Sequence, residues 1–223
     1  MESTIIFEDE HIIVYNKCAT IMVQPDRSDD PDLLEIAQAH CGHNLFVVHR
    51  IDRPVSGVVV YAKNKSVAHT LSAQFKERTV EKTYLAAVAT APPAQEGVLV
   101  HYLEKNPQKN RSTVHEILRK GTVRCELAYK VIGSTDHYQM LQVHLITGKY
   151  HQIRAQLAAV GCPIKGDVKY GARRKNQDRS IHLHSWRLGF FHPDSDEKVM
   201  FEAPIPEGDS LWAAIGTVIF SIP

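Results

Sequence analysis

The stretch His49-Arg50-Ile51-Asp52-Arg53-Pro54-Val55-Ser56-Gly57 leads directly into the apolar run 58–62. β-Branched residues dominate that run, which predicts a buried β-strand over 57–62. Asp52 lies between two arginines just before the strand, and guanidinium groups favour the ionised form of a neighbouring carboxylate. An ionised carboxylate suits a nucleophile or a charge stabiliser and is a poor general acid. The alternative is a structural ion pair at the start of the strand.

The 223 residues have an ordinary globular composition, with 43% hydrophobic and 23% charged residues. This length suffices for one large domain or two small ones, each with a buried core. No window is apolar over the ~20 residues that a membrane helix needs. The first residues lack the basic and apolar segments of a signal peptide. We therefore expect a cytoplasmic protein without a membrane partner.

The four cysteines do not have the spacing of a metal site. Cys18, Cys41, Cys125 and Cys162 form no C-x-x-C pair, whereas a structural zinc usually needs two close pairs of ligands. We expect free thiols that are mostly buried, and no bound metal.

The formal net charge is only +1, but the charges are unevenly distributed along the chain. The segments 1–35 and 190–223 are acidic, whereas 105–124 and 149–179 are basic. Two basic segments within an acidic frame could form one positive face. Chance clustering on a solvated surface is the alternative, so the pattern permits a nucleic acid partner without requiring one.

Short β-branched runs interrupted by single helices predict an α+β fold. Strands are expected at 4–7, 12–15, 57–62 and 81–89, and near 112–118, 122–132, 138–146, 181–191 and 198–202. Helices are expected at 30–39 with Asp30 as the N-cap, at 65–76 with Asn64 as the N-cap, at 151–160 and at 209–218. Residues 91–94 are expected to form a turn between two lobes, and 171–180 an exposed basic loop.

A second segment, 147–157, has the sequence TGKYHQIRAQL, in which a glycine turn precedes a helix. The first turns of this helix carry Lys149, His151 and Arg154, and a helix N-terminus with basic side chains is a natural anion site. The alternative is an ordinary helix start whose cations face solvent. Tyr84, on a predicted strand, is by itself more typical of a core residue than of a catalytic one.

Together these segments resemble the RluA-type RNA pseudouridine synthases. Residues 49–57 are similar to that family's H-R-L-D-R-x-T-S-G signature, and 147–157 to its T-G-R-x-H-Q-I-R-x-H-L element. Further similarity to the family is found at Glu8-Asp9, Val14, Asn16-Lys17, 163–167 (P-I-K-G-D), Tyr170-Gly171, 182–184 and 191–193 (F-H-P). The departures include Cys18-Ala19-Thr20 in place of P-A-G and Pro54-Val55 in place of the more common D-T. They affect the expected choice of substrate more than the expected activity.

The resemblance implies the pseudouridine synthase fold, with a mixed, mostly antiparallel central sheet in two lobes, a few flanking helices and a catalytic cleft. It implies one catalytic domain over 1–223 that isomerises uridine in RNA without a cofactor. Many relatives carry a small ribosomal-protein-like RNA-binding domain before the catalytic one, and we expect none here because the first strand begins at about residue 4. We expect a monomer with no obligatory protein partner.

The matched positions imply roles for single residues. Asp52 is the expected essential carboxylate and Arg154 its expected partner. Tyr84 is expected to stack on the target base and to move the proton from carbon 5, and Arg50 to fill the gap that the extracted nucleotide leaves. The remaining candidate RNA contacts are basic: Arg53, Lys105, Lys109, Arg111, Lys149, His151, Arg173, Arg174 and Lys175.

Flipping a nucleotide out of its stack costs a few kcal/mol and least in a loop, so a stem-loop is the expected substrate. By the resemblance, Asp52-Arg53-Pro54 favours tRNA, because proline at this position is familiar from tRNA-modifying members of the family, and ribosomal RNA or dual specificity remain open. An alternative function is an RNA-binding or RNA-folding protein with dispensable catalysis. A further alternative is a glycosidase, which would need a second carboxylate, with Glu77 or Glu81 as the nearest candidates.

Overall fold

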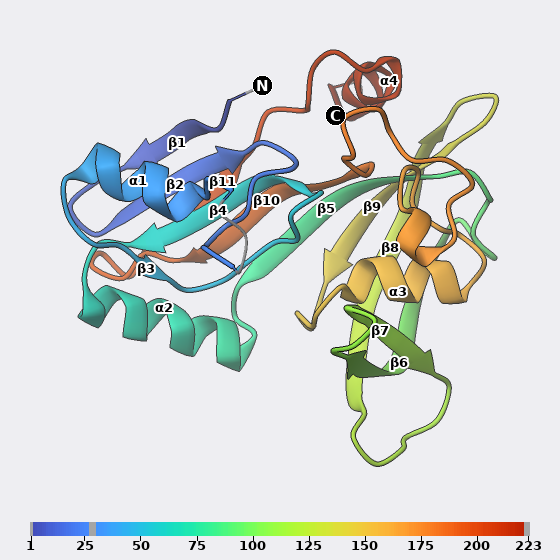
Figure 1. Cartoon of the computed structure of the whole chain (residues 1–223), viewed down its shortest axis with the longest axis horizontal. Helices are drawn as coiled ribbons and strands as arrows, with labels where there is room; N and C mark the ends of the chain where they lie inside the picture. The colour runs from blue at the N-terminus through green and yellow to red at the C-terminus, as the bar shows by residue number, and fades with distance from the viewer. Residues whose placement is uncertain (1, 27–29, 221–223) are drawn as a thin grey trace. The chain divides into compact units, whose positions relative to one another are not determined.

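The computed structural model describes residues 2–26 and 30–220, which form eleven strands, most of them antiparallel, and four α-helices (Figure 1). This α+β architecture confirms the expected fold class. The chain divides into two compact units, 1–82 with 184–204 and 83–183 with 205–223. Among the described residues, no helix has the length and apolarity needed to cross a bilayer.

The expected boundary between lobes at 91–94 is wrong. The division falls between Lys82 and Thr83, inside the continuous strand β5 (Glu81–Val88). Residues 91–94 only connect β5 to β6 (Glu96–Asn106) within the second unit. Prolines interrupt local structure, whereas compact units are defined by contacts between distant segments, so a proline-rich turn need not mark their boundary.

The first unit is built around β4 (Ser56–Ala62). β1 (Thr4–Glu8) and β2 (Ile12–Lys17) form the expected hairpin, and β2 pairs antiparallel with β4. β4 also pairs with the short β3 (Phe46–Val47), antiparallel, and with β10 (Leu183–Phe191), parallel, while β11 (Lys198–Glu202) pairs with β10. All seven residues of β4 are buried. A strand covered on both faces is mostly apolar and does not alternate, as the run 57–62 shows.

Two helices belong to the first unit. α2 (Lys65–Glu77) has Asn64 as its N-cap, as expected, and its Val67 and Leu71 pack against apolar residues of β2 and β4. α1 (Leu33–Cys41) begins later than expected, because Asp32 and not Asp30 accepts the capping hydrogen bond, from the Glu35 N–H at 3.1 Å.

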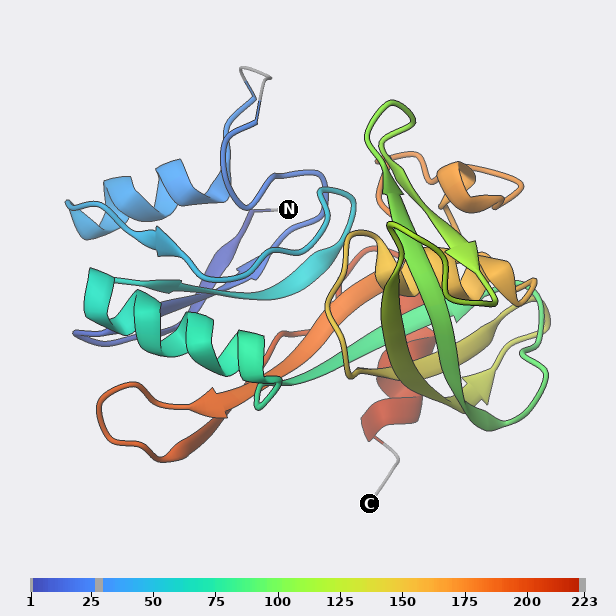
Figure 2. The ribbon, with the colours of Figure 1, turned by 90° about the horizontal axis from the view of Figure 1, so that it is seen from below.

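The second unit contains an antiparallel sheet in the order β5, β9 (Gln139–Leu145), β8 (Val123–Ser134), β6 and β7 (Arg111–His115). Its helices are α3 (Gln152–Ala159), α4 (Ser210–Phe220) and the short 3₁₀ turn η1 (Val168–Tyr170). α3 lies beside the β6–β7 hairpin (Figure 2). β6 is absent from the expected elements. Its apolar residues lie on both faces, since Leu103 is buried whereas the valines at positions 98 and 100 are exposed, so they do not show the alternation of a half-buried strand.

Candidate active site

Asp52 lies on the connection between β3 and β4 in the first unit, on a turn whose backbone is held by hydrogen bonds. The Val55 N–H donates to the Asp52 carbonyl at 3.0 Å, which closes the turn. The next carbonyl, that of Arg53, accepts from the Thr20 N–H at 2.8 Å and from Lys17 Nζ at 3.3 Å. The backbone on the C-terminal side of Asp52 is therefore fixed by the segment that follows β2.

Lys17 is fully buried and donates to three carbonyls, those of Cys18 at 3.0 Å, Ile21 at 2.8 Å and Arg53. Burial lowers the pKa of its ammonium group to about 7, and the nearby Asp52 carboxylate opposes that shift. Sequence reasoning noted Lys17 only as part of a matching motif. Its role as a clamp on the Asp52 turn became visible only with its three acceptors.

The end of the signature, Ser56-Gly57, forms the contact of β4 with β10. The Ser56 hydroxyl lies 2.8 Å from His184 Nδ1, and His184 Nε2 lies 3.5 Å from the Ala203 carbonyl. Burial lowers the pKa of His184 to about 4, so the ring is neutral at pH 7. A neutral ring that donates from Nε2 to the carbonyl accepts the Ser56 proton at Nδ1. Ser56 and Gly57 therefore suit the place where β4 and β10 pair.

The Arg53 side chain forms an ion pair with Asp30. Its Nη2 donates to Asp30 at 2.6 Å, and its Nε donates to the Thr20 carbonyl at 2.8 Å. The side chain is 47% exposed. Arg50 is also exposed, so both arginines that flank Asp52 are accessible from solvent.

In the second unit, Arg154 is buried in α3 and paired with Asp167. Its Nε and Nη2 donate to the two carboxylate oxygens at 2.7 and 2.9 Å, in a bidentate pair. The guanidinium carbon lies 5.1 Å from the centre of the Tyr170 ring. The alternative of solvent-facing cations at this helix start is therefore wrong for Arg154. The pair joins the 147–157 element to the P-I-K-G-D element, a connection that the sequence did not reveal. Tyr84, on β5 of the same unit, is 8% exposed.

His151 does not provide the cation expected at the start of α3. It adopts φ +52°, its ring stacks on Tyr150 with centroids 3.9 Å apart, and its Nδ1 lies 3.0 Å from the Tyr170 hydroxyl. Burial, with nearby cations, lowers its pKa to about 3, so the ring is neutral at pH 7. Lys149 is exposed and supplies the positive charge at this end of the helix.

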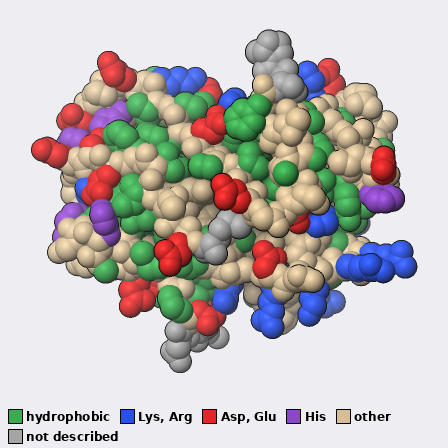
Figure 3. Space-filling view, turned by 90° about the horizontal axis from the view of Figure 1, so that it is seen from above, with side chains coloured by type: hydrophobic (Ala, Val, Ile, Leu, Met, Phe, Trp, Pro, Cys, Tyr) green, Lys and Arg blue, Asp and Glu red, His purple; other side chains and the backbone are tan. Residues whose placement is uncertain are grey.

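Two cations from the β6–β7 hairpin lie over aromatic rings near α3. Lys105 Nζ is 4.7 Å from the centre of the Tyr150 ring, and the Arg111 guanidinium is 5.1 Å from that of Tyr170. Both belong to the basic segment 105–124, which the fold thus brings to the basic segment 149–179. Lys109 and the three basic residues 173–175 are exposed in loops. On the face drawn in Figure 3 the largest group of Lys and Arg side chains lies at the lower right.

Comparison with known proteins shows the family of the chain. Residues 11–159, about two thirds of the chain, match the family described as RNA pseudouridylate synthase. The chain belongs to this family. It is 29% identical over 221 residues to the ribosomal large subunit pseudouridine synthase D of Zymomonas mobilis, with 91% of this chain and 69% of that protein covered. It is 31% identical over 216 residues to the uncharacterized RNA pseudouridine synthase YlyB of Bacillus subtilis, with 93% and 70% covered.

The fold is also that of solved pseudouridine synthases. The structure of human RNA pseudouridylate synthase domain containing 4 superposes with a TM-score of 0.77 at 23% identity, and covers 97% of this chain and 92% of that one. The expected family and fold are thereby confirmed. The protein is an RNA pseudouridine synthase, which is an isomerase.

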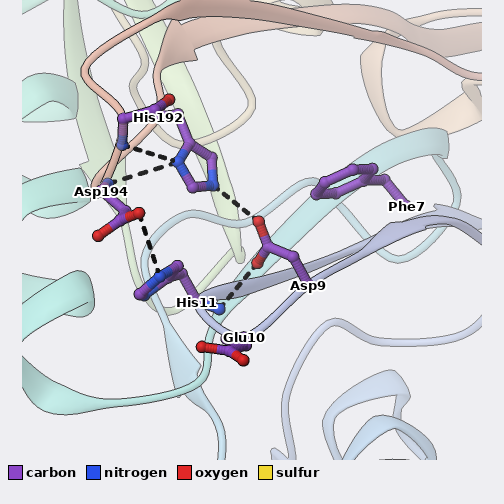
Figure 4. Close-up of a pocket in the computed structure, with 7 residues that line it drawn as sticks. Phe7, Asp9, Glu10, His11, His192 and Asp194 are labelled. Carbon is purple, nitrogen blue, oxygen red and sulfur yellow. Dashed lines mark hydrogen bonds and ion pairs between the residues drawn. The ribbon is translucent and has the colours of Figure 1, made fainter.

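The remaining motifs of this pseudouridine synthase have structural roles. Asp9 of the β1–β2 turn accepts from the His11 and Ile12 N–H groups at 2.8 Å each, and its other oxygen lies 2.9 Å from His192 Nε2 in the β10–β11 turn (Figure 4). The E-D and F-H-P motifs therefore connect two turns of the first unit. The shallow pocket beside them is lined by Phe7, Asp9, Glu10, His11, His192, Asp194 and Ser195. It contains none of the expected catalytic residues.

The glycosidase alternative needs a second carboxylate, and neither of its two candidates, Glu77 and Glu81, lies in a buried environment. Glu81 is exposed and bound to Lys198 Nζ at 2.5 Å, and Glu77 is exposed at the end of α2. Within residues 2–26 and 30–220, no group of three or more His, Cys, Asp or Glu side chains could hold a metal ion.

Proposed function

We propose that this pseudouridine synthase isomerises a uridine in a structured RNA loop and that Asp52 is its essential carboxylate. The observation that carries the proposal is the held turn: Lys17 and Thr20 fix the backbone directly after Asp52. Preorganised geometry of this kind is what a reacting carboxylate requires.

The reaction is an isomerisation and needs no external reactant. The bond from carbon 1′ of the ribose to nitrogen 1 of uracil breaks, and the base turns within the site. Carbon 5 then bonds to carbon 1′, loses its proton, and nitrogen 1 is protonated. Asp52 must begin ionised whether it attacks the sugar, attacks the base or assists glycal formation, because only the carboxylate can act as a nucleophile or accept a proton.

Arg154 and Tyr84 complete the proposed catalytic group. The bidentate pair with Asp167 uses two of the five N–H donors of the Arg154 guanidinium. Its fixed plane suits the binding of a second carboxylate, and we assign that role to Asp52. Tyr84 would stack on the uracil and carry the proton from carbon 5. We propose that 1–223 is one catalytic domain, and we expect it to act as a cytoplasmic monomer.

Exposed cations support the binding of RNA. Arg50, exposed two residues before Asp52, would fill the space that the flipped nucleotide leaves. Phosphate contacts are assigned to basic side chains of both units: Arg53, Lys105, Lys109, Arg111, Lys149, Arg173, Arg174 and Lys175. His151 would contact RNA only as a neutral group.

Two RNA classes are candidates for the substrate. The Asp52-Arg53-Pro54 sequence supports a tRNA stem-loop. The name of the Zymomonas relative, a ribosomal large subunit synthase, supports ribosomal RNA as the second candidate. Both present loops in which a uridine can be extracted at low cost.

The decisive experiment maps pseudouridines in tRNA and ribosomal RNA from a strain that lacks the gene. The mapping detects reverse-transcription stops after carbodiimide treatment. A site that disappears in this strain and returns with the wild-type gene, but not with Asp52→Ala, supports both the activity and the carboxylate. Restoration by Asp52→Ala would refute the role of Asp52. If no site is lost but a cellular defect is rescued by both genes, an RNA-folding role is favoured over catalysis.

A further inference from the structure

The two edges of β4 are paired differently. β2 pairs with one edge along the whole stretch from Gly57 to Ala62. The other edge is shared: β10 pairs with residues 56–57, and β3 pairs with residues 61–62. In the described part of the chain, the strand ladders on this second edge therefore leave a gap at 58–60.

Two side chains provide hydrogen bonds within this gap. The Ser185 hydroxyl donates to the Val58 carbonyl at 3.4 Å, and the Val60 N–H donates to His49 Nε2 at 3.0 Å. In the register of β3, Phe46 lies opposite Ala62 and Val47 opposite Tyr61, so a continued ladder would place Val48 opposite Val60. The chain leaves the ladder there, and the imidazole replaces the missing carbonyl acceptor.

The His49 ring is held in this orientation. It stacks on Phe75 of α2, with ring centroids 4.8 Å apart and planes inclined by 16°. Burial, with a smaller effect of the nearby Lys82 ammonium, lowers its pKa to about 3. The ring is therefore neutral at pH 7, and because Nε2 accepts from Val60, its proton resides on Nδ1.

We infer that His49 is a positioning residue for Asp52, because its imidazole ends the pairing of β3 and fixes the point where the Asp52 loop leaves the sheet. Only Arg50 and the buried Ile51 separate the two residues. Lys17 holds the same loop on the other side of Asp52. The loop is thus held at both ends, by the buried Lys17 and the half-buried His49, and loss of either contact would loosen the carboxylate. This inference rests on the proposed function.

Two substitutions separate the hydrogen bond from the ring stack. His49→Phe keeps a flat ring against Phe75 but removes the acceptor for the Val60 N–H. His49→Gln loses the ring but retains an acceptor of similar reach. His69→Gln is the matched control, because His69 is exposed on α2. Each protein is tested on [5-³H]uridine-labelled RNA from a strain lacking the gene. Tritium release under single-turnover conditions reports the chemistry, and filter binding reports the Kd for the same RNA.

We expect His49→Phe to lower the tritium-release rate about 10- to 100-fold, since small displacements of a reacting group have effects of this size. The Kd for RNA should stay within about twofold of wild type, because all the assigned phosphate contacts except Arg53 lie outside the Asp52 loop. His49→Gln should retain most of the wild-type tritium-release rate, and His69→Gln should retain all of it. A purely structural role would lower the melting temperature without this split between rate and Kd.

The inference is overturned if folded His49→Phe protein releases tritium within about twofold of the wild-type rate. If His49→Phe does not fold, His49→Gln is compared with His49→Asn, because the shorter amide of asparagine cannot reach the Val60 N–H. Equal tritium-release rates of these two variants would overturn the inference. Asp52→Ala is run in parallel. If wild-type protein releases no tritium, the proposed function fails and this inference with it, whereas an active wild type that His49→Phe equals overturns only the inference.

Discussion

Gly57 packs its Cα against the backbone of Ser185, so that a Cβ on Gly57 would lie 2.1 Å from the Ser185 carbonyl oxygen. Gly57 also has φ +114°, which L side chains rarely adopt. The contact occurs where β4 and β10 pair in parallel, with Ser185 opposite Gly57. Glycine at the end of the signature therefore permits the strand pairing that follows the Asp52 loop.

Gly57→Ala should destabilise the protein by about 3–5 kcal/mol, because the backbone clash adds to an unfavourable φ. The measurement is the free energy of unfolding in urea. Gly216→Ala, in α4, is the matched control, since a Cβ there would meet nothing closer than 4.0 Å. In a helix this change should stabilise by about 0.5–1 kcal/mol. Equal unfolding curves for the two variants would contradict the assignment.

Asp167→Ala should cost about 3–5 kcal/mol of stability, because it leaves the Arg154 guanidinium buried without this carboxylate. Both side chains are almost fully buried, at 5% and 1% exposure. Glu202→Ala removes the exposed partner of Arg187 and should cost less than about 1 kcal/mol. Urea denaturation of both variants tests the difference. A cost for Asp167→Ala no larger than for Glu202→Ala would show that Arg154 is stabilised by other contacts.

Thr20→Gly should stabilise the protein by about 1 kcal/mol. Thr20 has φ +75°, a strained conformation for a β-branched residue that costs about 1–3 kcal/mol, and the greater freedom of glycine in the unfolded chain offsets part of the gain. The melting temperature should rise by about 2–4 °C for a chain of this size. Thr20→Ala, which keeps a Cβ, should gain less than Thr20→Gly. A lower melting temperature for Thr20→Gly would refute the strain.

Stability should fall as the pH drops from about 6.5 towards 4. Burial holds the pKa of His184 at about 4 and that of His151 at about 3 in the folded protein, whereas an unfolded histidine takes up a proton near pH 6.5. In this interval the unfolded state binds more protons, so the stability present above pH 6.5 is lost at about 1.4 kcal/mol per pH unit for each buried histidine.

Urea denaturation at pH 7, 5.5 and 4.5 checks this slope. His184→Gln should reduce it by the contribution of one histidine, and the exposed His69→Gln should leave it unchanged. A free energy of unfolding that stays constant between pH 7 and 4.5 would contradict the burial of neutral rings.

Local sequence signals were sufficient for several elements. The β-branched run before Ala62 predicts β4, and Asn64 with apolar residues at helical spacing predicts α2, because each signal lies within the element itself. The Asp52 and Arg154 motifs likewise indicate the family, since their residues are contiguous. The N-cap of α1 could not be chosen this way: Asp30 and Asp32 are both suitable, and Arg53, more than twenty residues later, binds Asp30.

The sequence by itself thus determined the fold class, the family and the candidate residues, because these depend on local patterns and contiguous motifs. Only the tertiary structure decided their partners: Asp167 for Arg154, the Arg53 carbonyl for Lys17, and the Val60 N–H for His49. It also decided that His151 is neutral. Burial and hydrogen-bond partners come from segments distant in the chain, and the cost of burying an unpaired charge or polar group makes those partners decisive.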